Sequence, residues 1–351
     1  MSGKIMSVQD ALGLIRDGDK AVQSIGSLFT NPDPDEARKY FHSKSRTKTD
    51  KLMSLKDAIE RFVKDGDYLA IGGFGTHRTP IAACQEIVRQ GRKNMGFAGH
   101  TSTHDFQILA AGEVFNRVDI AYIIGLEARG MSPCAKSYME SGRVKICEWS
   151  NFSLAARLKA AAMGIPFLPT RNMLGTDTFK HSAGKTMTCP FTDKTLALQP
   201  ALYPDVSVIH VHEADITGNC RIRGIVISDD DLASASKKLI ITTERLIHND
   251  EIRSDPSRTV IPYYLVDAVC EVPYGAYPTG MPYEYYSDEE HLKQWLTVQK
   301  KPGAFKAFLK SNIYDCPDHA AYIELSGGID RIQELRAREL LLHKEEKHAE
   351  L

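Results

Sequence analysis

The sequence lacks the features that mark several common classes of protein. It has no run of about 18 uncharged apolar residues, and residues 1–17 lack the basic-then-apolar order of a secretory signal. Its 44 basic and 45 acidic residues nearly cancel, so the chain has no field for holding nucleic acid or an anionic membrane. These absences predict a cytoplasmic protein that binds neither nucleic acid nor a membrane.

Sites for metals, redox chemistry and nucleotides also lack their usual signatures. The seven cysteines are scattered, without a Cys-x-x-Cys pair, and are interpreted as reduced, mostly buried thiols. No Gly-x-Gly-x-x-Gly opens a helix, and residues 182–186 end like a phosphate-binding loop but have Phe179 where its first glycine belongs. His210 and His212 share one face of a strand without an identifiable third ligand, so we interpret them as core histidines and predict no metal site.

The residues that are present alternate between helical and strand patterns. With 351 residues and 42% hydrophobic content, the chain can bury one large or two modest cores. We therefore predict an α/β fold with an open, largely parallel sheet and helices on both faces, and ligands at the carboxyl ends of the strands. The expected strands are 68–73, 95–98, 120–124, 206–211 and 238–242, and the expected helices are 57–63, 81–91, 106–111 and 154–163.

Three segments are predicted along the chain. Residues 1–50 form an N-terminal extension, in which 6–11 partly repeats 53–58 and a polar, charged stretch from residue 31 onward has the composition of a linker. The repeat is a decayed duplicate, a docking arm or a coincidence. Residues 51–328 form the functional domain, and the charged tail 329–351 is a helix with one partly apolar side.

The most informative stretch runs from Asp65 to Pro80 and reads Asp-Gly-Asp-Tyr-Leu-Ala-Ile-Gly-Gly-Phe-Gly-Thr-His-Arg-Thr-Pro. It predicts a turn, a buried strand and a loop whose glycines allow a ligand or another backbone to approach main-chain N–H groups. Taken alone, Gly-Gly-Phe-Gly is a weak signal, because any tight strand-to-helix turn uses glycine.

In its context, this stretch resembles the N-terminal signature of the A subunits of family I coenzyme A transferases. The family usually has glycine two residues before the proline, where this chain has Arg78, and the glutaconate coenzyme A-transferase branch is similar here with its polar or charged loop. The resemblance continues over roughly residues 53–300. Its further segments are Ala160–Pro169, Val208–His210, Glu244–Ile247, Asp250–Pro256, Ile261–Pro262, Val266–Val269 and Pro273–Pro278.

The resemblance implies the family I transferase fold and an exchange of coenzyme A between an acyl thioester and a carboxylate. The family uses a glutamate nucleophile in a Ser-Glu-Asn-Gly type motif on the B subunit, and this sequence contains no such motif. We therefore expect a hetero-oligomer of A and B subunits, with no catalytic residue on this chain alone, no permanently bound cofactor, and a coenzyme A thioester as substrate. The alternatives are a related acyl-coenzyme A hydrolase or decarboxylase and, less favoured, a non-catalytic sensor, although neither end shows a basic helix-turn-helix.

The resemblance and the strand ends together give the candidate residues of the substrate pocket. These are Gly72, Gly73, Phe74 and Thr76 for main-chain contact, Arg78, the lining residues His100, Thr101 and Ser102, and the pair Glu127 and Arg129.

Several of these residues have alternative interpretations. Arg78 either binds a distal substrate carboxylate or forms a surface or intersubunit ion pair. Glu127 is either a nucleophile or base of a divergent member or part of a salt bridge. The run Asp229–Asp231 is interpreted as a solvated turn or a helix start, and the tyrosines of Pro273–Tyr286 as pocket lining or an intersubunit surface.

Overall fold

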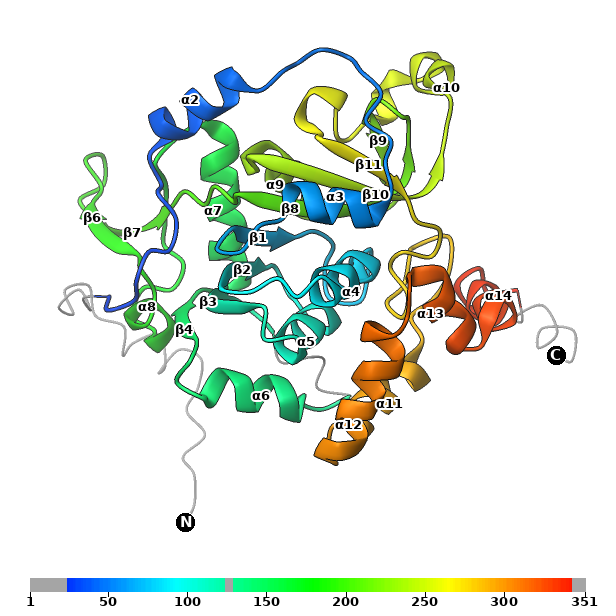
Figure 1. Cartoon of the computed structure of the whole chain (residues 1–351). Helices are drawn as coiled ribbons and strands as arrows, with labels where there is room; N and C mark the ends of the chain where they lie inside the picture. Colours follow the sequence, from blue (N-terminus) through cyan, green and yellow to red (C-terminus); the bar gives the residue numbers. More distant parts are fainter. Residues whose placement is uncertain (1–23, 124–128, 343–351) are drawn as a thin grey trace, which may run out of the picture.

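The computed structural model describes residues 24–123 and 129–342. Its centre is an eight-stranded sheet in which the main strands are parallel (Figure 1). The strand order is β11 (Ala268–Glu271), β10 (Lys238–Leu246), β8 (Val206–Ala214), β1 (Tyr68–Ile71), β2 (Met95–Gly99), β3 (Phe115–Ile120) and β4 (Lys145–Glu148), with the short β9 (Cys220–Arg221) antiparallel to β8. The predicted fold class is confirmed.

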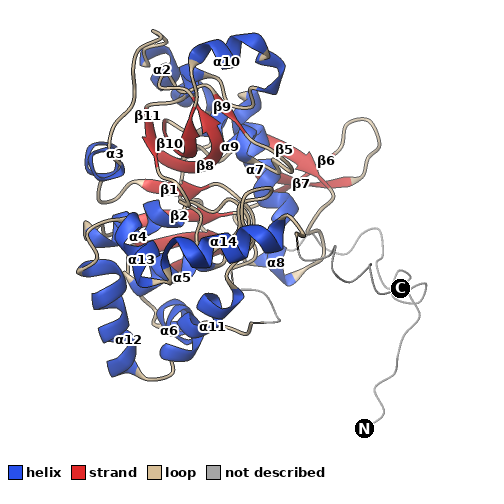
Figure 2. Ribbon diagram, turned by 90° about the vertical axis from the view of Figure 1, so that its right-hand side faces the viewer, coloured by secondary structure: helices blue, strands red, loops and turns tan. Residues whose placement is uncertain are grey.

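Helices cover both faces of the sheet, because the central strands are apolar on both sides. In β1, Leu69 and Ile71 pack into one hydrophobic core, whereas Tyr68 and Ala70 pack into the other. Figure 2 shows α3 and α4 on one side of the sheet and α7 and α9 on the opposite side. The first side has α3 (Leu55–Phe62), α4 (Ile81–Arg89), α5 (His104–Ala111) and α6 (Pro133–Glu140), and the second has α7 (Asn151–Met163) and α9 (Asp229–Ala235).

The helix ends follow local sequence signals. Ser54 and Ser150 cap the N-termini of α3 and α7 by accepting hydrogen bonds from main-chain N–H groups. Gly164 ends α7 in the left-handed conformation, with φ 67°, as expected for a glycine at this position.

Two smaller units flank the main sheet. One is an antiparallel sheet of β5 (Phe167–Thr170), β7 (Thr195–Pro200) and β6 (Lys185–Thr188), with α8 (Asp177–Lys180) beside it. The other, at the opposite end of Figure 1, consists of α11 (Glu289–Val298), α12 (Pro302–Leu309), the π-helix η3 (Lys310–Tyr314), α13 (His319–Leu325) and α14 (Gly328–Glu339). The segment between β10 and β11 contains the short helix α10 (Asn249–Ser254) and the 3-10 helices η1 (Pro256–Arg258) and η2 (Tyr263–Leu265).

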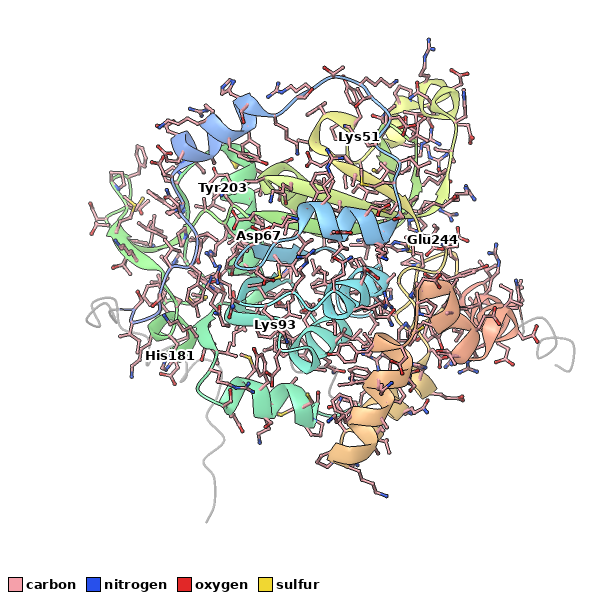
Figure 3. The ribbon with its side chains drawn as sticks, viewed as in Figure 1. Lys51, Asp67, Lys93, His181, Tyr203 and Glu244 are labelled. Carbon is pink, nitrogen blue, oxygen red and sulfur yellow. The ribbon has the colours of Figure 1, made fainter. Side chains whose placement is uncertain are left out.

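The described part of the predicted extension packs against the rest of the chain. It contains α2 (Pro34–Ser43) where the composition indicated a linker. Lys44 Nζ contacts the Asp267 carboxylate at 2.6 Å. Lys51, which is the first residue after the extension and is labelled in Figure 3, donates from Nζ to the Tyr263 carbonyl at 2.6 Å. The boundary at residue 51 stays a prediction, and the partial repeat lies largely outside the described residues.

The first part of the predicted C-terminal helix 329–351 is helical, as α14, which ends at Glu339; residues 343–351 lie outside the described part of the chain, so the segment as a whole stays a prediction. None of the described helices has both the length and the apolar character needed to cross a membrane.

Candidate active site

The site lies where the strand order reverses. From β1 the chain proceeds outward through β2, β3 and β4, whereas β8, β10 and β11 follow one another in the opposite direction. The loop after β1 therefore lies at the switch point between β1 and β8, where ligands bind in open α/β sheets. Gly72, Gly73, Phe74 and Thr76 all belong to this loop, which we call the glycine loop (residues 72–80).

Most main-chain N–H groups of the glycine loop donate hydrogen bonds to acceptors within the chain. Gly73 N donates to Asp229 Oδ1 at 2.8 Å, Gly72 N donates to the Val208 carbonyl, and Phe74 N donates to the His77 carbonyl. In this conformation these three N–H groups have acceptors within the chain, and the predicted main-chain contact of Gly72, Gly73, Phe74 and Thr76 with substrate stays a prediction. Thr76 contributes its carbonyl, which accepts a hydrogen bond from Gly280 N.

The glycines allow other parts of the chain to approach closely. A Cβ atom on Gly72 would lie 2.5 Å from Asp229 Oδ1. Gly73 has φ 81°, and a Cβ atom there would lie 2.7 Å from the main chain of Arg78. The loop therefore requires glycine at both positions because protein atoms fill the adjacent space.

Arg78 is buried, with 1% of its side chain exposed, and is paired inside the chain. Its Nη1 lies 2.6 Å from Asp229 Oδ2, and its Nη2 donates to the Ile225 carbonyl at 2.7 Å. The expectation of a surface or intersubunit ion pair is therefore corrected to an internal one. Asp229 holds both the Gly73 N–H group and the Arg78 guanidinium, so this carboxylate fixes the glycine loop against the loop before α9.

Asp229 also corrects an interpretation of the sequence. It begins α9, as one of the two alternatives predicted, but only 2% of its side chain is exposed, so this residue is not solvated. The local sequence does not distinguish Asp229 from Asp230 and Asp231, because burial is decided by the distant glycine loop.

His100, Thr101 and Ser102 follow β2 and lie beside the glycine loop. The His100 ring stacks edge-on against Phe74 with centroids 5.2 Å apart, and the Thr101 carbonyl accepts from Gly75 N at 2.8 Å. Burial lowers the pKa of His100, so the ring is neutral at neutral pH. Ser102 instead donates to Asp105, which directs its hydroxyl into α5.

Three non-glycine residues around the glycine loop have left-handed backbone conformations. The φ angles are 58° for Arg78, 52° for Thr101 and 58° for Ile227. This conformation is unfavourable for side chains branched at Cβ, such as those of Thr101 and Ile227. Strained backbone of this kind is concentrated at functional sites, where surrounding contacts hold it in place.

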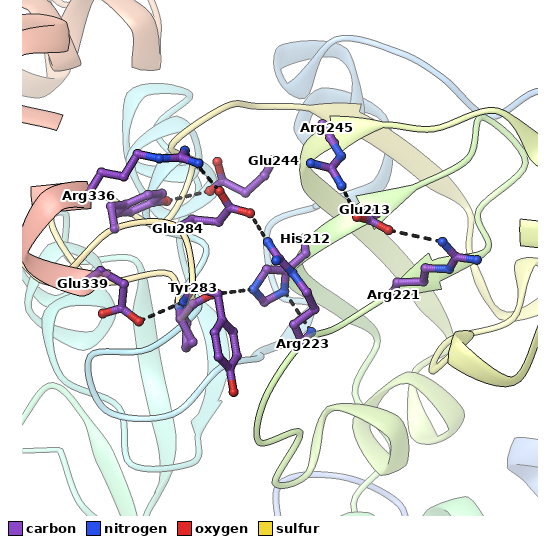
Figure 4. Close-up of polar contacts among 12 residues, drawn as sticks. His212, Glu213, Arg221, Arg223, Glu244, Arg245, Tyr283, Glu284, Arg336 and Glu339 are labelled. Carbon is purple, nitrogen blue, oxygen red and sulfur yellow. Dashed lines mark hydrogen bonds and ion pairs between the residues drawn. The ribbon is translucent and has the colours of Figure 1, made fainter. Parts of the chain in front are cut away.

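A hollow of about 360 Å³ opens beside the glycine loop. Its lining residues are Phe74, His77, Arg78, Gly224, Ile225, Ile227, Pro282, Tyr283 and Glu339. Glu339, from α14, accepts a hydrogen bond from Tyr283 N at 2.8 Å, as Figure 4 shows. The hollow therefore combines segments from distant parts of the sequence. No sequence signal indicated Ile225, Ile227 or Glu339 as lining residues.

Of the second predicted pair, only Arg129 belongs to the described residues. Glu127 lies outside the described residues. Arg129 pairs with Glu289 of α11, with Nε 2.6 Å from Oε2. The guanidinium therefore connects the segment after β3 to the C-terminal helices.

The histidines of β8 are buried, as predicted. His210 lies 2.8 Å from Thr242 Oγ1 and 2.7 Å from Glu244 Oε1, and His212 Nε2 lies 2.8 Å from the Pro282 carbonyl. No group of three or more potential metal ligands was found among the described residues.

The tyrosines of the 273–286 segment divide between two environments. Tyr277 and Tyr285 are buried in a core with residues of α13 and α14, whereas Tyr283 and Tyr286 are exposed. Of the exposed pair, Tyr283 lines the hollow.

Comparison with known proteins agrees with this architecture. The family described as Coenzyme A transferase matches residues 52–272. The chain is 33% identical to the A subunit of glutaconate CoA-transferase of Acidaminococcus fermentans, over 79% of this chain and 92% of the relative. It is 32% identical to the A subunit of 3-oxoadipate CoA-transferase of Pseudomonas knackmussii, over 77% of this chain and 96% of the relative.

Solved structures give the same result. The crystal structure of glutaconate coenzyme A-transferase from Acidaminococcus fermentans aligns with a TM-score of 0.74 and 32% identity, over 79% of this chain and 93% of that chain. The decarboxylase AibA/AibB aligns with a TM-score of 0.68 and 31% identity, over 76% of this chain and 98% of that chain. The chain therefore belongs to the coenzyme A transferase family, as do the A subunits of the two transferases compared above.

Proposed function

We propose that this chain is the A subunit of a heteromeric coenzyme A transferase. The proposal rests on the glycine loop at the switch point of a chain that belongs to this family. The substrates are an acyl-coenzyme A and a carboxylate, and the chain needs no permanently bound cofactor. The acyl groups in the names of the relatives do not determine the acyl group used here.

The proposed nucleophile is a glutamate of the B subunit. It attacks the acyl thioester and releases the coenzyme A thiolate, leaving an acyl anhydride; the thiolate then attacks the glutamyl carbonyl and releases the acyl carboxylate. The resulting glutamyl thioester passes through the reverse steps with the acceptor carboxylate. This route keeps the free energy of the thioester because no step consumes water.

The role proposed for this chain is to shape the wall of the acyl site. The Asp229 carboxylate holds the glycine loop at Gly73 and the neighbouring loop through Arg78. Both loops border the hollow, so a fixed wall orients the acyl group relative to a nucleophile from the partner. Phe74 contributes an apolar surface, and the neutral His100 ring supports it from behind.

The test compares label exchange between acyl-coenzyme A and labelled acetate for the chain alone and for its complex with the B subunit. We expect label exchange only in the complex. We also expect that, after incubation of the complex with acyl-coenzyme A, borohydride modifies the B-subunit glutamate. Exchange by the isolated chain would contradict the proposal.

A matched pair of variants tests whether Asp229 fixes the glycine loop that borders the acyl site. Asp229→Asn is expected to lower exchange at least about tenfold, because it leaves the buried Arg78 charge without its counterion. Asp231→Asn removes a carboxylate in the same helix that pairs with Lys159 and leaves the glycine loop intact, so exchange should stay near that of the unaltered complex. Equal activity of the two variants would contradict the role of Asp229.

A second candidate function is decarboxylation, favoured by the similarity to AibA/AibB. Release of carbon dioxide from an acyl-coenzyme A without label exchange would support this alternative and reject the transferase.

A further inference from the structure

The hollow beside the glycine loop is lined mainly by apolar side chains. Phe74, Ile225, Ile227, Pro282 and Tyr283 form most of its wall. Ile225 is 75% exposed and Ile227 is 44% exposed, although large aliphatic side chains gain free energy on burial. A volume of about 360 Å³ is within the range of small-molecule sites and suits a short acyl group.

The arginine that lines this hollow is not available to a substrate carboxylate. Its guanidinium is almost fully buried, and Asp229 neutralises its charge at 2.6 Å. Turning Arg78 toward a substrate would leave Asp229 buried without a counterion, which is costly in a protein interior.

Among the described residues, the remaining charges near the hollow provide no excess of positive charge. Arg223 and Arg336 both contact the carboxylate of Glu284, as Figure 4 shows. Glu339 lines the hollow directly and is half-buried. The three arginines Arg78, Arg223 and Arg336 are thus balanced by three carboxylates of the described chain, those of Asp229, Glu284 and Glu339. A second substrate carboxylate would meet Glu339 without an excess cation among these residues to offset the repulsion.

We propose that this hollow binds an acyl group whose far end is apolar and uncharged, such as a short straight, branched or aromatic chain. The inference rests on the proposed function and specifies its substrate class. In this proposal the chain differs from the two transferase relatives in the charge at the far end of its acyl group. The names of those relatives refer to glutaconate and 3-oxoadipate, which are both dicarboxylic acids.

The test uses valeryl-coenzyme A and glutaryl-coenzyme A, which have five-carbon acyl groups and differ by the distal carboxylate. In the complex with the B subunit, kcat/KM for valeryl-coenzyme A is expected to exceed that for glutaryl-coenzyme A at least about tenfold. An equal or higher value for glutaryl-coenzyme A would overturn the inference and show that a cation from elsewhere serves the site.

Glu339→Gln separates the charge from the shape of the hollow, because glutamine still offers an acceptor to Tyr283 N. This variant is expected to raise the glutaryl-to-valeryl ratio about three- to tenfold by removing the repulsion. Asp330→Asn, an exposed acidic position on the same helix, is the matched control and should leave the ratio as it is. A ratio that does not change in Glu339→Gln would reject the role of this carboxylate.

The same assay distinguishes this inference from the proposed function. In the same reactions, the total loss of thioester is measured together with label exchange. The binding of valeryl-coenzyme A and of glutaryl-coenzyme A to the complex is measured by calorimetry. Absence of exchange rejects the transferase, whereas the ratio of thioester loss or of binding still decides the substrate class.

Discussion

Acidification from pH 7.5 to 5.5 is expected to destabilise the fold through three buried imidazoles. Burial is the main cause that lowers the pKa of His104 to about 3 and the pKa values of His212 and His319 to about 4. At most 7% of each of these residues is exposed. Below about pH 6.5 the unfolded state binds protons that these buried rings do not bind in the folded state. The contribution of the three neutral rings to the free energy of unfolding is therefore present above the unfolded pKa and is lost as the pH falls below it.

The magnitude follows from the unfolded pKa of about 6.5. At pH 5.5 each unfolded imidazole is about nine-tenths protonated, while the folded rings stay neutral. Each ring therefore lowers the free energy of unfolding by about 1.4 kcal/mol relative to pH 7.5, and the three together by about 4 kcal/mol. This is a large part of the roughly 5–15 kcal/mol that stabilises a typical domain, and it corresponds to a fall in Tm of roughly 5 °C.

Thermal and urea unfolding at several pH values in this window measures the effect. His104→Phe should reduce the pH-dependent loss to about 2.7 kcal/mol, because one titrating ring is removed while packing against Trp295 is kept. His42→Gln, at an exposed position on α2, is the control and should not reduce the loss. If the free energy of unfolding changed by less than about 1 kcal/mol between pH 7.5 and 5.5, the reasoning from burial would be refuted.

Two further predictions concern close packing and buried charge. Gly72→Ala should destabilise the chain by about 1–3 kcal/mol in urea unfolding, because the new Cβ would lie 2.5 Å from Asp229 Oδ1. The control is Gly303→Ala, whose new Cβ would have no atom within 4 Å, and this variant should be neutral or stabilising. Equal effects would show that the loop near Gly72 relaxes. Asp119→Asn should cost about 3–5 kcal/mol, because it removes the counterion of the fully buried Arg157, 2.6 Å away. A loss under about 1 kcal/mol would show that the pair is dispensable.

Local patterns predicted the elements whose signals lie within a few residues. The strand Tyr68–Ile71 is an uninterrupted apolar run followed by glycines, and α7 is an alanine-rich stretch that ends at Gly164. Both were found close to their predicted bounds. The strand expected at 120–124 instead occurs as β3, Phe115–Ile120, and residues 124–128 lie outside the described chain.

The shift of β3 has a physical reason. Its sequence, Phe-Asn-Arg-Val-Asp-Ile, looks too polar for a central strand. Asp119 is nevertheless fully buried, because it accepts hydrogen bonds from Trp149 Nε1 at 2.5 Å, from Arg157 Nη1 at 2.6 Å and from Tyr68. These partners lie in three other segments, so no local pattern could reveal that the carboxylate would be satisfied.

The same limit applies to the site. The glycine loop and the segment His100–Ser102 could be predicted because each follows a recognisable strand. Asp229 could not be separated from its acidic neighbours, and Glu339 lies in a tail that contains many glutamates. Their positions depend on contacts between segments that are far apart in the chain.

The pairing of β1 with β8 has a consequence for how the molecule forms. The two strands that meet at the switch point belong to segments linked by a hydrogen bond between residues 137 positions apart, Tyr68 and Asp205. Closing so long a loop carries an entropic cost before any contact rewards it, so this junction belongs to the slow part of folding. During synthesis, the glycine loop emerges long before Asp229, and its final shape therefore depends on the second half of the chain.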